Sequence, residues 1–466
     1  MIRNVSGNIN VTGTNVFNGG ISNVSGIINI DGMNTFNSSI SNARNGNITI
    51  SGDNTFTNLN ANKGGAITNI SSVLNILGNT KFIGNTSTLG GAIYLGSAST
   101  ANILASFGST IAGEGNIADK GGAIYIDSAK DVVISGSFIN NTANELGGAI
   151  YSNSNLTIAA LGSNQVTFRG NLANGVSNAI YIDSSMSSIP TLTLNLSDTG
   201  VINFYDIVTG YEATTPINRY NINIISSTAD GDENDTAVNF YNYVNNANIT
   251  IEDVSVSLDA TDSLITDNTS VDDKKTISEE FLKNSSIKLV SGTLSLNTIT
   301  LNNYSDNTSL NTLLVEPTGN KIPSLLLNNS FVKLSNDRAD LTLNTVNNTY
   351  LGELHSNNTE YSIDVILVGD GDYYFKGDGT LVVEPGKENA ADTIEVATGS
   401  IGTILLTSIN FINENQTNRG IIQILKGDLQ NSNITLDLSD DLKNKTWDYS
   451  IDNYISDQFN DVVTVV

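Results

Sequence analysis

The sequence GGAI occurs four times, at residues 64–67, 90–93, 121–124 and 147–150, and a degraded copy, SNAI, occupies residues 177–180. The alanines of these copies, at positions 66, 92, 123, 149 and 179, are 26, 31, 26 and 30 residues apart. A self-similar spacing in this range is typical of units that bury their apolar side chains only by stacking on their neighbours. The repeat therefore predicts a solenoid.

Three shorter copies precede the GGAI repeats. Phe17, Phe36 and Phe56 align at spacings of 19 and 20 residues, each with a glycine four residues earlier and an asparagine two residues earlier. Apolar and polar residues alternate between them, which predicts β-strands. Because the connections are too short for crossover helices, parallel pairing requires the chain to coil into a β-helix. We expect the phenylalanines to stack inside it and the asparagines (Asn15, Asn34, Asn54) to form an amide ladder at a turn.

A second pattern, FxxN, accompanies GGAI. Phe82, Phe138 and Phe168 are each followed three residues later by an asparagine, whereas the unit around Phe107 keeps the aromatic residue and lacks the asparagine. In each Ala-Ile-Tyr strand we expect the isoleucine to point inward and the tyrosine to stack on the outer face. The FxxN asparagines are Asn85, Asn141 and Asn171, and the outer tyrosines are Tyr94, Tyr125, Tyr151 and Tyr181.

The patterns divide the chain into three predicted parts, all of them β-rich. Residues 1–183 are predicted to form a β-helix with the Phe/Asn and GGAI repeats. Residues 184–285 lack the motif and are predicted to be an irregular insertion or loop-rich rungs, with one short helix at residues 278–284. Alternation returns in residues 286–466, for which we predict further β-helix rungs.

Composition excludes several classes of function. The 466 residues contain 47 acidic and 21 basic side chains, a formal charge of −26, and this charge disfavours binding to nucleic acid. There are no cysteines, so disulfides and thiolate metal sites are impossible. No apolar run reaches the length of a membrane-spanning helix.

No residues form a recognisable catalytic, cofactor or metal site. Asp127 and Asp183 both follow a repeat tyrosine by two residues, but the other copies hold Asn153 or Ser97 nearest this place, so no carboxylate pair recurs. His355 has no second imidazole and is predicted to lie in an exposed loop. The acidic stretches 230–235 and 369–379 lack the spacing of a calcium loop. We therefore predict that the chain is not an enzyme and takes no cofactor.

The paired GGAI and FxxN tetrapeptides, in a chain rich in glycine and asparagine, resemble the passenger domains of the polymorphic outer membrane protein family of autotransporters. The resemblance rests on residues 56–183. It implies a right-handed parallel β-helix displayed on the surface of a Gram-negative bacterium, with an adhesive or immune-facing role. Members carry a signal peptide and a C-terminal membrane β-barrel, and this chain has neither. We expect a fragment truncated at both ends, whose only membrane attachment is the missing barrel; anchoring by another means is the alternative.

The expected function is adhesin-like binding to a protein or glycan on a host or neighbouring cell. The outer row Tyr94, Tyr125, Tyr151 and Tyr181 is the predicted binding face, because a flat amphipathic aromatic strip suits such contacts. Cross-rung stacking that only stabilises the sheet is the competing interpretation. Two alternatives for the whole chain remain: a cell-surface polysaccharide-degrading enzyme on the same fold, and a structural stalk that associates with itself.

Overall fold

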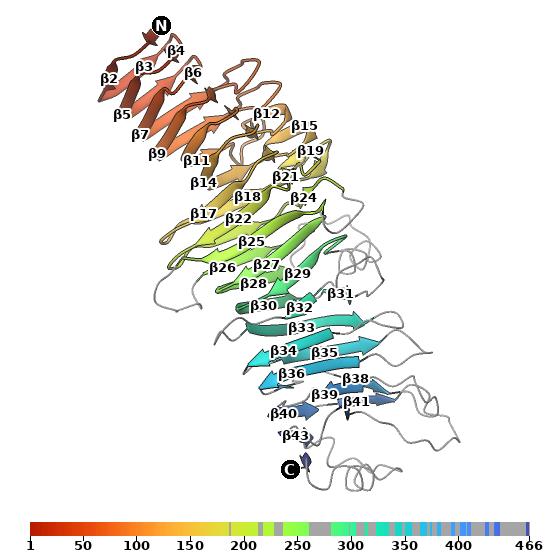
Figure 1. The fold of residues 1–466 in the computed structure, drawn as a ribbon. Helices are drawn as coiled ribbons and strands as arrows, with labels where there is room; N and C mark the ends of the chain where they lie inside the picture. The colour runs from red at the N-terminus through yellow and green to blue at the C-terminus, as the bar shows by residue number, and fades with distance from the viewer. Residues whose placement is uncertain are drawn as a thin grey trace. The chain divides into compact units, whose positions relative to one another are not determined.

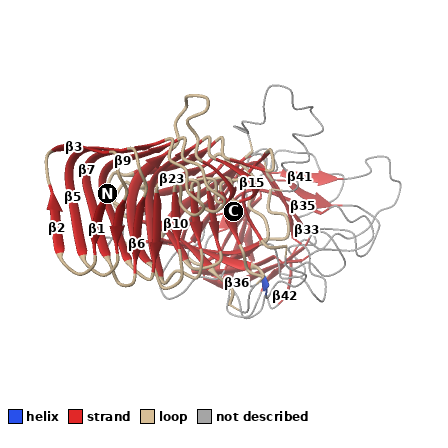
Figure 2. Ribbon diagram, turned by 90° about the horizontal axis from the view of Figure 1, so that it is seen from above, coloured by secondary structure: helices blue, strands red, loops and turns tan. Residues whose placement is uncertain are grey.

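The computed structural model describes residues 1–185, 188–212, 218–227, 236–260, 281–297 and 299, and beyond these the strands named at the end of this section. The chain forms two compact units, Met1–Asn248 and Ile249–Val466. The regular elements of the described residues are β-strands joined by loops and turns (Figure 2). In the first unit, equivalent strands of successive rungs pair in parallel and in register; Ile28 pairs with Ile48 and Phe36 with Phe56. The predicted all-β, parallel β-helix fold is confirmed.

Sheet A contains the short strands of successive rungs, among them those that follow the GGAI glycine pairs (Figure 1). Each strand is three or four residues long and pairs with the equivalent strand of the next rung. Its strands are β1 (Ile2–Asn4), β4 (Ile21–Asn23), β6 (Ile40–Ala43), β8 (Ile67–Ile70), β10 (Ile93–Leu95), β13 (Ile124–Ile126), β16 (Ile150–Ser152), β21 (Ile180–Ile182) and β24 (Val208–Gly210).

Sheet B contains the longer alternating strands. Several of them bend at a glycine with positive φ, such as Gly32 (φ 115) and Gly52 (φ 81), so the sheet turns a corner in the middle of the strand. Its strands in the first unit are β2 (Asn8–Val11), β3 (Thr14–Phe17), β5 (Ile27–Phe36), β7 (Asn47–Thr57), β9 (Val73–Ile83), β11 (Thr100–Phe107), β14 (Asp131–Ile139), β17 (Leu156–Ala160), β18 (Gln165–Arg169), β22 (Thr191–Leu196), β23 (Val201–Phe204), β25 (Tyr220–Ser226) and β26 (Ala237–Phe240).

Sheet C is small and belongs to the rungs that carry FxxN and GGAI. It consists of β12 (Ile117–Lys120), β15 (Thr142–Leu146), β19 (Leu172–Ala173) and β20 (Val176–Ser177). β19 and β20 pair antiparallel across Asn174 and Gly175, which both have positive φ. Asn-Gly with positive φ at both positions is the preferred two-residue hairpin turn, and this hairpin covers the last edge of the sheet.

The phenylalanine stack predicted for three residues is confirmed and is longer than predicted. Nine rings lie inside the β-helix, and neighbouring centroids are 4.1 to 5.0 Å apart with nearly parallel planes. The stack continues past residue 183, where the GGAI motif ends. Its members are Phe17, Phe36, Phe56, Phe82, Phe107, Phe138, Phe168, Phe204 and Phe240.

The amide ladder predicted for the short repeats is also present. The Nδ2 of Asn15 donates to Oδ1 of Asn34 at 2.8 Å, and Asn34 donates to Asn54 at 2.9 Å. A further ladder, which the sequence analysis did not identify, runs along sheet A, where Asn23 donates to Asn42 at 2.9 Å and Asn42 to Asn69 at 2.7 Å.

The FxxN asparagines form a third ladder, and it corrects one prediction. The unit around Phe107 does have the ladder residue: Asn116 occupies the place, nine residues after the phenylalanine instead of three. Asn85 donates to Asn116 and Asn116 to Asn141, each at 2.9 Å. The intervening residues 108–115 form a loop that leaves the rung and returns, so a search at fixed spacing misses the asparagine.

The glycine pair is required by backbone geometry. Gly90, the first glycine of the second copy, has φ 66, a backbone conformation that is strained for any residue with a side chain. A Cβ added to the next residue, Gly91, would lie 2.1 Å from the carbonyl oxygen of Gly122 in the following rung. GGAI is therefore a consequence of close contact between rungs.

Residues 184–285 contain regular rungs where the structure describes them. β22 pairs with β25 over six residues and β23 with β26 over four, all parallel. The short helix predicted at residues 278–284 falls partly outside the described residues, and residues 281–284 form a turn. The predicted three-part division stays a prediction.

The second unit also consists of parallel strand pairs, for example Leu294 with Leu325. β27 (Ala247–Glu252) crosses the boundary between the units. The other strands are β28 (Val254–Asp259), β29 (Ser286–Leu289), β30 (Gly292–Asn297), β31 (Thr300–Asn303), β32 (Leu313–Val315), β33 (Pro323–Leu334), β34 (Leu341–Val346), β35 (Tyr350–Ser356), β36 (Asp364–Asp370), β37 (Tyr373–Tyr374), β38 (Thr380–Val383), β39 (Thr393–Val396), β40 (Ile401–Leu406), β41 (Ser408–Phe411), β42 (Leu425–Gly427), β43 (Asn433–Leu438) and β44 (Val463–Val465).

Candidate functional site on the tyrosine row

The four repeat tyrosines lie side by side on the outer face of sheet A, as predicted. Tyr94 pairs in register with Tyr125, Tyr125 with Tyr151 and Tyr151 with Tyr181. Their ring centroids are 5.6, 4.7 and 5.8 Å apart, with interplanar angles below 10°. Each inner ring therefore has a tyrosine on both faces.

This stacking limits what the row can bind. A ring face that contacts the next tyrosine is not available to a sugar or an aromatic side chain. Tyr94 and Tyr151 are only 3% and 4% exposed, and only Tyr125 and Tyr181 remain partly exposed. The binding role of the row stays a prediction, and the geometry restricts it to ring edges and hydroxyls, which favours the competing, structural interpretation.

Tyr94 and Tyr151 each contact a lysine and an aspartate side chain, in the same arrangement. The Nζ of Lys63 lies 4.5 Å from the ring centroid of Tyr94 and donates to its hydroxyl at 3.2 Å. The Tyr94 hydroxyl in turn donates to Oδ2 of Asp127 at 2.8 Å. The lysine, the tyrosine and the aspartate come from three successive rungs, so side-chain contacts connect the rungs on the surface as well as in the core.

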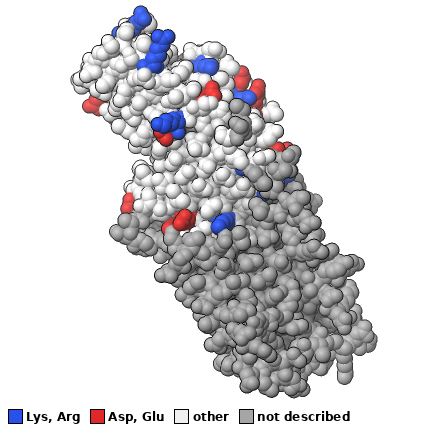
Figure 3. Space-filling model, viewed as in Figure 1, with Lys and Arg blue, Asp and Glu red and all other residues white. Residues whose placement is uncertain are grey.

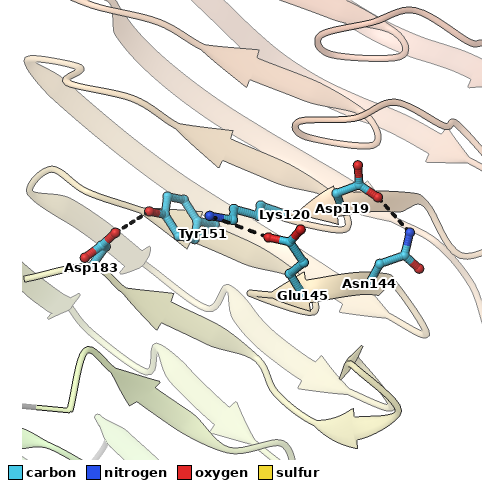
Figure 4. A network of polar contacts seen from close by, with 6 residues as sticks. All are labelled: Asp119, Lys120, Asn144, Glu145, Tyr151 and Asp183. Atoms are coloured by element: carbon cyan, nitrogen blue, oxygen red, sulfur yellow. Dashed lines mark hydrogen bonds and ion pairs between the residues drawn. The ribbon is translucent and has the colours of Figure 1, made fainter. Parts of the chain in front are cut away.

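The same kind of arrangement occurs again, two rungs further along the β-helix (Figure 4). Nζ of Lys120 lies 5.5 Å from the ring centroid of Tyr151, whose hydroxyl donates to Oδ2 of Asp183 at 2.5 Å. Lys120 follows Lys63 by 57 residues and Tyr151 follows Tyr94 by 57. The alternation of 26-residue spacings with 30- or 31-residue ones in the GGAI motif reflects the same two-rung period.

Polar contacts continue from this arrangement toward sheet C. Lys120 pairs with Glu145 at 3.6 Å, the only ion pair found among the described residues, and Asn144 donates to Asp119 at 2.8 Å (Figure 4). Both partners of the ion pair are substantially exposed, so the pair contributes little to stability.

The tyrosine hydroxyls are poor acids. Burial and the hydrogen bonds to Asp127 and Asp183 raise the pKa of Tyr94 and Tyr151 well above its usual value, and burial beside Asp183 raises the pKa of Tyr181 to about 12. Burial opposes ionisation of Asp183, but hydrogen bonds from Ser185 and Tyr151 outweigh it and lower the pKa of this carboxyl. At neutral pH Tyr151 is therefore a neutral donor to the charged carboxylate of Asp183, which is a positioning role.

The remaining candidates from the sequence are placed as follows. His355 lies in strand β35, paired with Lys333 of β33, so the predicted loop is wrong. The acidic stretch 230–235 lies outside the described residues, and of the stretch 369–379 only strand residues are described. Within the described residues no group of three or more His, Cys, Asp or Glu side chains could hold a metal ion, and no helix could span a membrane.

Comparison of the chain with protein-family models, curated proteins and solved structures found no match.

Proposed function

We propose that the chain is a surface-exposed passenger of autotransporter type from a Gram-negative bacterium, which acts as an adhesin-like binding scaffold without catalysis. The supporting observation is the continuity of the internal stack. Nine phenylalanine rings at 4.1 to 5.0 Å and the ladder of buried asparagines join consecutive rungs. Such a stack holds the outward residues of many rungs in fixed positions, which suits a molecule that presents a surface to a partner.

The interior residues are occupied by this packing, so binding is assigned to the outer faces. The partners we propose are a protein or a glycan on a host or neighbouring cell. The FxxN and GGAI pairs that resemble the autotransporter passengers lie in the same rungs as the buried ladder, so the resemblance and the fold support the proposal together.

The test is adhesion by the purified full chain. Beads coated with it are expected to adhere to epithelial monolayers or to bacterial cells in greater number than beads coated with albumin. Equal adhesion of both kinds of bead to every surface would refute the binding role. Release of reducing sugar from a polysaccharide panel, abolished by a single Asp-to-Asn change, would instead support the enzyme alternative.

A further inference from the structure

A second outward feature lies on sheet B, in the part of each rung that precedes the corner at which the longer strands bend. Nine outward residues form one unbroken column, each paired in register with the next. All but one carry an amide or a hydroxyl. We call them the Asn/Thr column: Asn10, Asn29, Thr49, Asn75, Asn102, Val133, Thr157, Thr193 and Asn223.

Several polar groups of this column have no hydrogen-bond partner among the described residues. In the buried ladder, each asparagine donates to the next. In the Asn/Thr column, Asn29 donates to Asn10 at 2.9 Å, but among the described residues the side chains of Asn102, Thr157 and Thr193 make no hydrogen bond. All three are exposed or half-buried, so their donors and acceptors face solvent and are available to a ligand.

The surface around the column has very few charges. The stretches that carry it are residues 8–11, 27–31, 47–51, 73–77, 100–104, 131–135, 156–160, 191–196 and 220–226, and they include Asp31 and Asp131 and no lysine, arginine or histidine. Lys81 and Asp53 lie past the bend of their strands, and Lys130 directly precedes residue 131. In a chain with a formal charge of −26, the column's own stretches supply no cation for phosphate, sulfate or uronate groups, which favours an uncharged ligand. On the side seen in Figure 3, which is the side seen in Figure 1, charged atoms of the described residues lie in small separate groups.

The column is flanked by apolar side chains that suit the C–H faces of sugar rings. Leu77 and Leu104 are paired in register and are 46% and 38% exposed, and Ile27 is 39% exposed. The tyrosine row, in contrast, has its ring faces covered by neighbouring tyrosines. Polar groups with adjacent apolar surface therefore occur on sheet B rather than on the row that the sequence indicated.

The dimensions argue against a stable protein partner. Three outward residues per strand span about 13 Å, and eight steps between rungs span about 38 Å, at about 4.8 Å per step. The resulting area is roughly 500 Å², below the roughly 800 Å² that each partner buries in a typical protein complex. One rung step is close to the length of one pyranose unit, so an extended chain of sugars can follow the column in step with it.

We propose that the Asn/Thr column and its flanking leucines bind an uncharged polysaccharide that lies along the axis of the β-helix, with one sugar per rung. This inference deepens the proposed binding function and rests on it. Amides and hydroxyls at Asn102, Thr157 and Thr193 hydrogen-bond the sugar hydroxyls, and Leu77 and Leu104 contact the ring faces.

The experiment measures binding of the full chain to soluble neutral oligosaccharides (cellohexaose, chitohexaose and mannohexaose) and to polygalacturonate, by calorimetry. The test variant is Asn102→Ala with Thr157→Ala and Thr193→Ala. The matched control is Thr55→Ala with Ser106→Ala and Thr167→Ala, which are outward residues of the same sheet beyond the bend and also make no side-chain hydrogen bond among the described residues. At least one neutral oligosaccharide is expected to bind, with Kd at least tenfold weaker for the test variant and within twofold for the control.

Five outcomes overturn the inference. Coated beads that still adhere to cells while no neutral oligosaccharide binds would refute it and leave the proposed function standing. Preference for polygalacturonate, or equal losses in the two variants, would also refute it. Self-association that the test variant abolishes would assign the face to a second copy of the chain. If the wild-type chain shows neither bead adhesion nor sugar binding, the proposed function is refuted too.

Discussion

Replacement of Asn116 by alanine tests how the buried ladder stabilises the β-helix. Asn116 is fully buried, donates to the carbonyl of Phe82 at 3.0 Å and to Oδ1 of Asn141 at 2.9 Å, and accepts from the backbone and side chain of Asn85 at 3.0 and 2.9 Å. Asn116→Ala removes all four hydrogen bonds without changing the backbone.

The cost depends on which groups lose their last partner. The Phe82 carbonyl still accepts from the N–H of Gly108 at 2.8 Å, and Oδ1 of Asn141 still accepts from the N–H of residue 116 at 3.0 Å. The Asn85 N–H has no other acceptor among the described residues. An orphaned buried donor costs about 1–3 kcal/mol and each further lost bond about 0.5–1.5 kcal/mol, so we expect a loss of about 4 kcal/mol.

The control is Asn37→Ala. Asn37 also donates across rungs, to Asn18 at 2.8 Å, but it is exposed. Water replaces that hydrogen bond, and the expected loss is below about 0.5 kcal/mol.

Urea unfolding followed by circular dichroism measures the stability of both variants, and hydrogen exchange of the Asn85 amide measures the rung itself. Exchange of that amide is expected to accelerate strongly in Asn116→Ala. Similar losses of stability in the two variants, or a loss below about 1 kcal/mol in Asn116→Ala, would show that the buried hydrogen bonds of the ladder do not stabilise the β-helix more than exposed ones do.

Three further predictions concern the stack and the titrating groups. Phe82→Ala removes a fully buried ring with a phenylalanine on both faces and is expected to cost about 4 kcal/mol, whereas Phe17→Ala, at the first rung with one neighbour, should cost clearly less; equal shifts in the unfolding midpoint would contradict this. Tyr151→Phe removes the donor to Asp183 and is expected to destabilise the chain by about 1–2 kcal/mol while bead adhesion stays unchanged; lost adhesion with an unchanged midpoint would assign binding to the tyrosine row. Burial raises the pKa of Asp206 above 3.8, so the folded state binds this proton more tightly than the unfolded state, and the stability of wild type relative to Asp206→Asn should fall as pH rises from about 4 toward neutrality; a constant difference in urea midpoints across this range would argue against the shift.

The prediction of the fold depended on local repetition. Phe17, Phe36 and Phe56 with their glycines and asparagines predicted the coil, the inward stack and the first amide ladder, because one residue type at one spacing occupies one place in successive rungs. The prediction failed where an insertion changed the spacing, as between Phe107 and Asn116. It also missed Phe204 and Phe240, after which no GGAI copy occurs, although they continue the same stack.

The outer faces could not be predicted as fully, because their properties depend on contacts that the spacing of residues does not show. The sequence by itself determined that tyrosines follow GGAI and point outward. Only the tertiary structure decided that their ring faces cover one another, that Lys63 and Lys120 lie over two of the rings, and that Asp127 and Asp183 accept hydrogen bonds from two of the hydroxyls. Repetition along the chain determines which residues share a column, because rungs stack in register. Whether a column is covered or free depends on side chains from rungs and loops on either side, and these meet only when the chain has coiled.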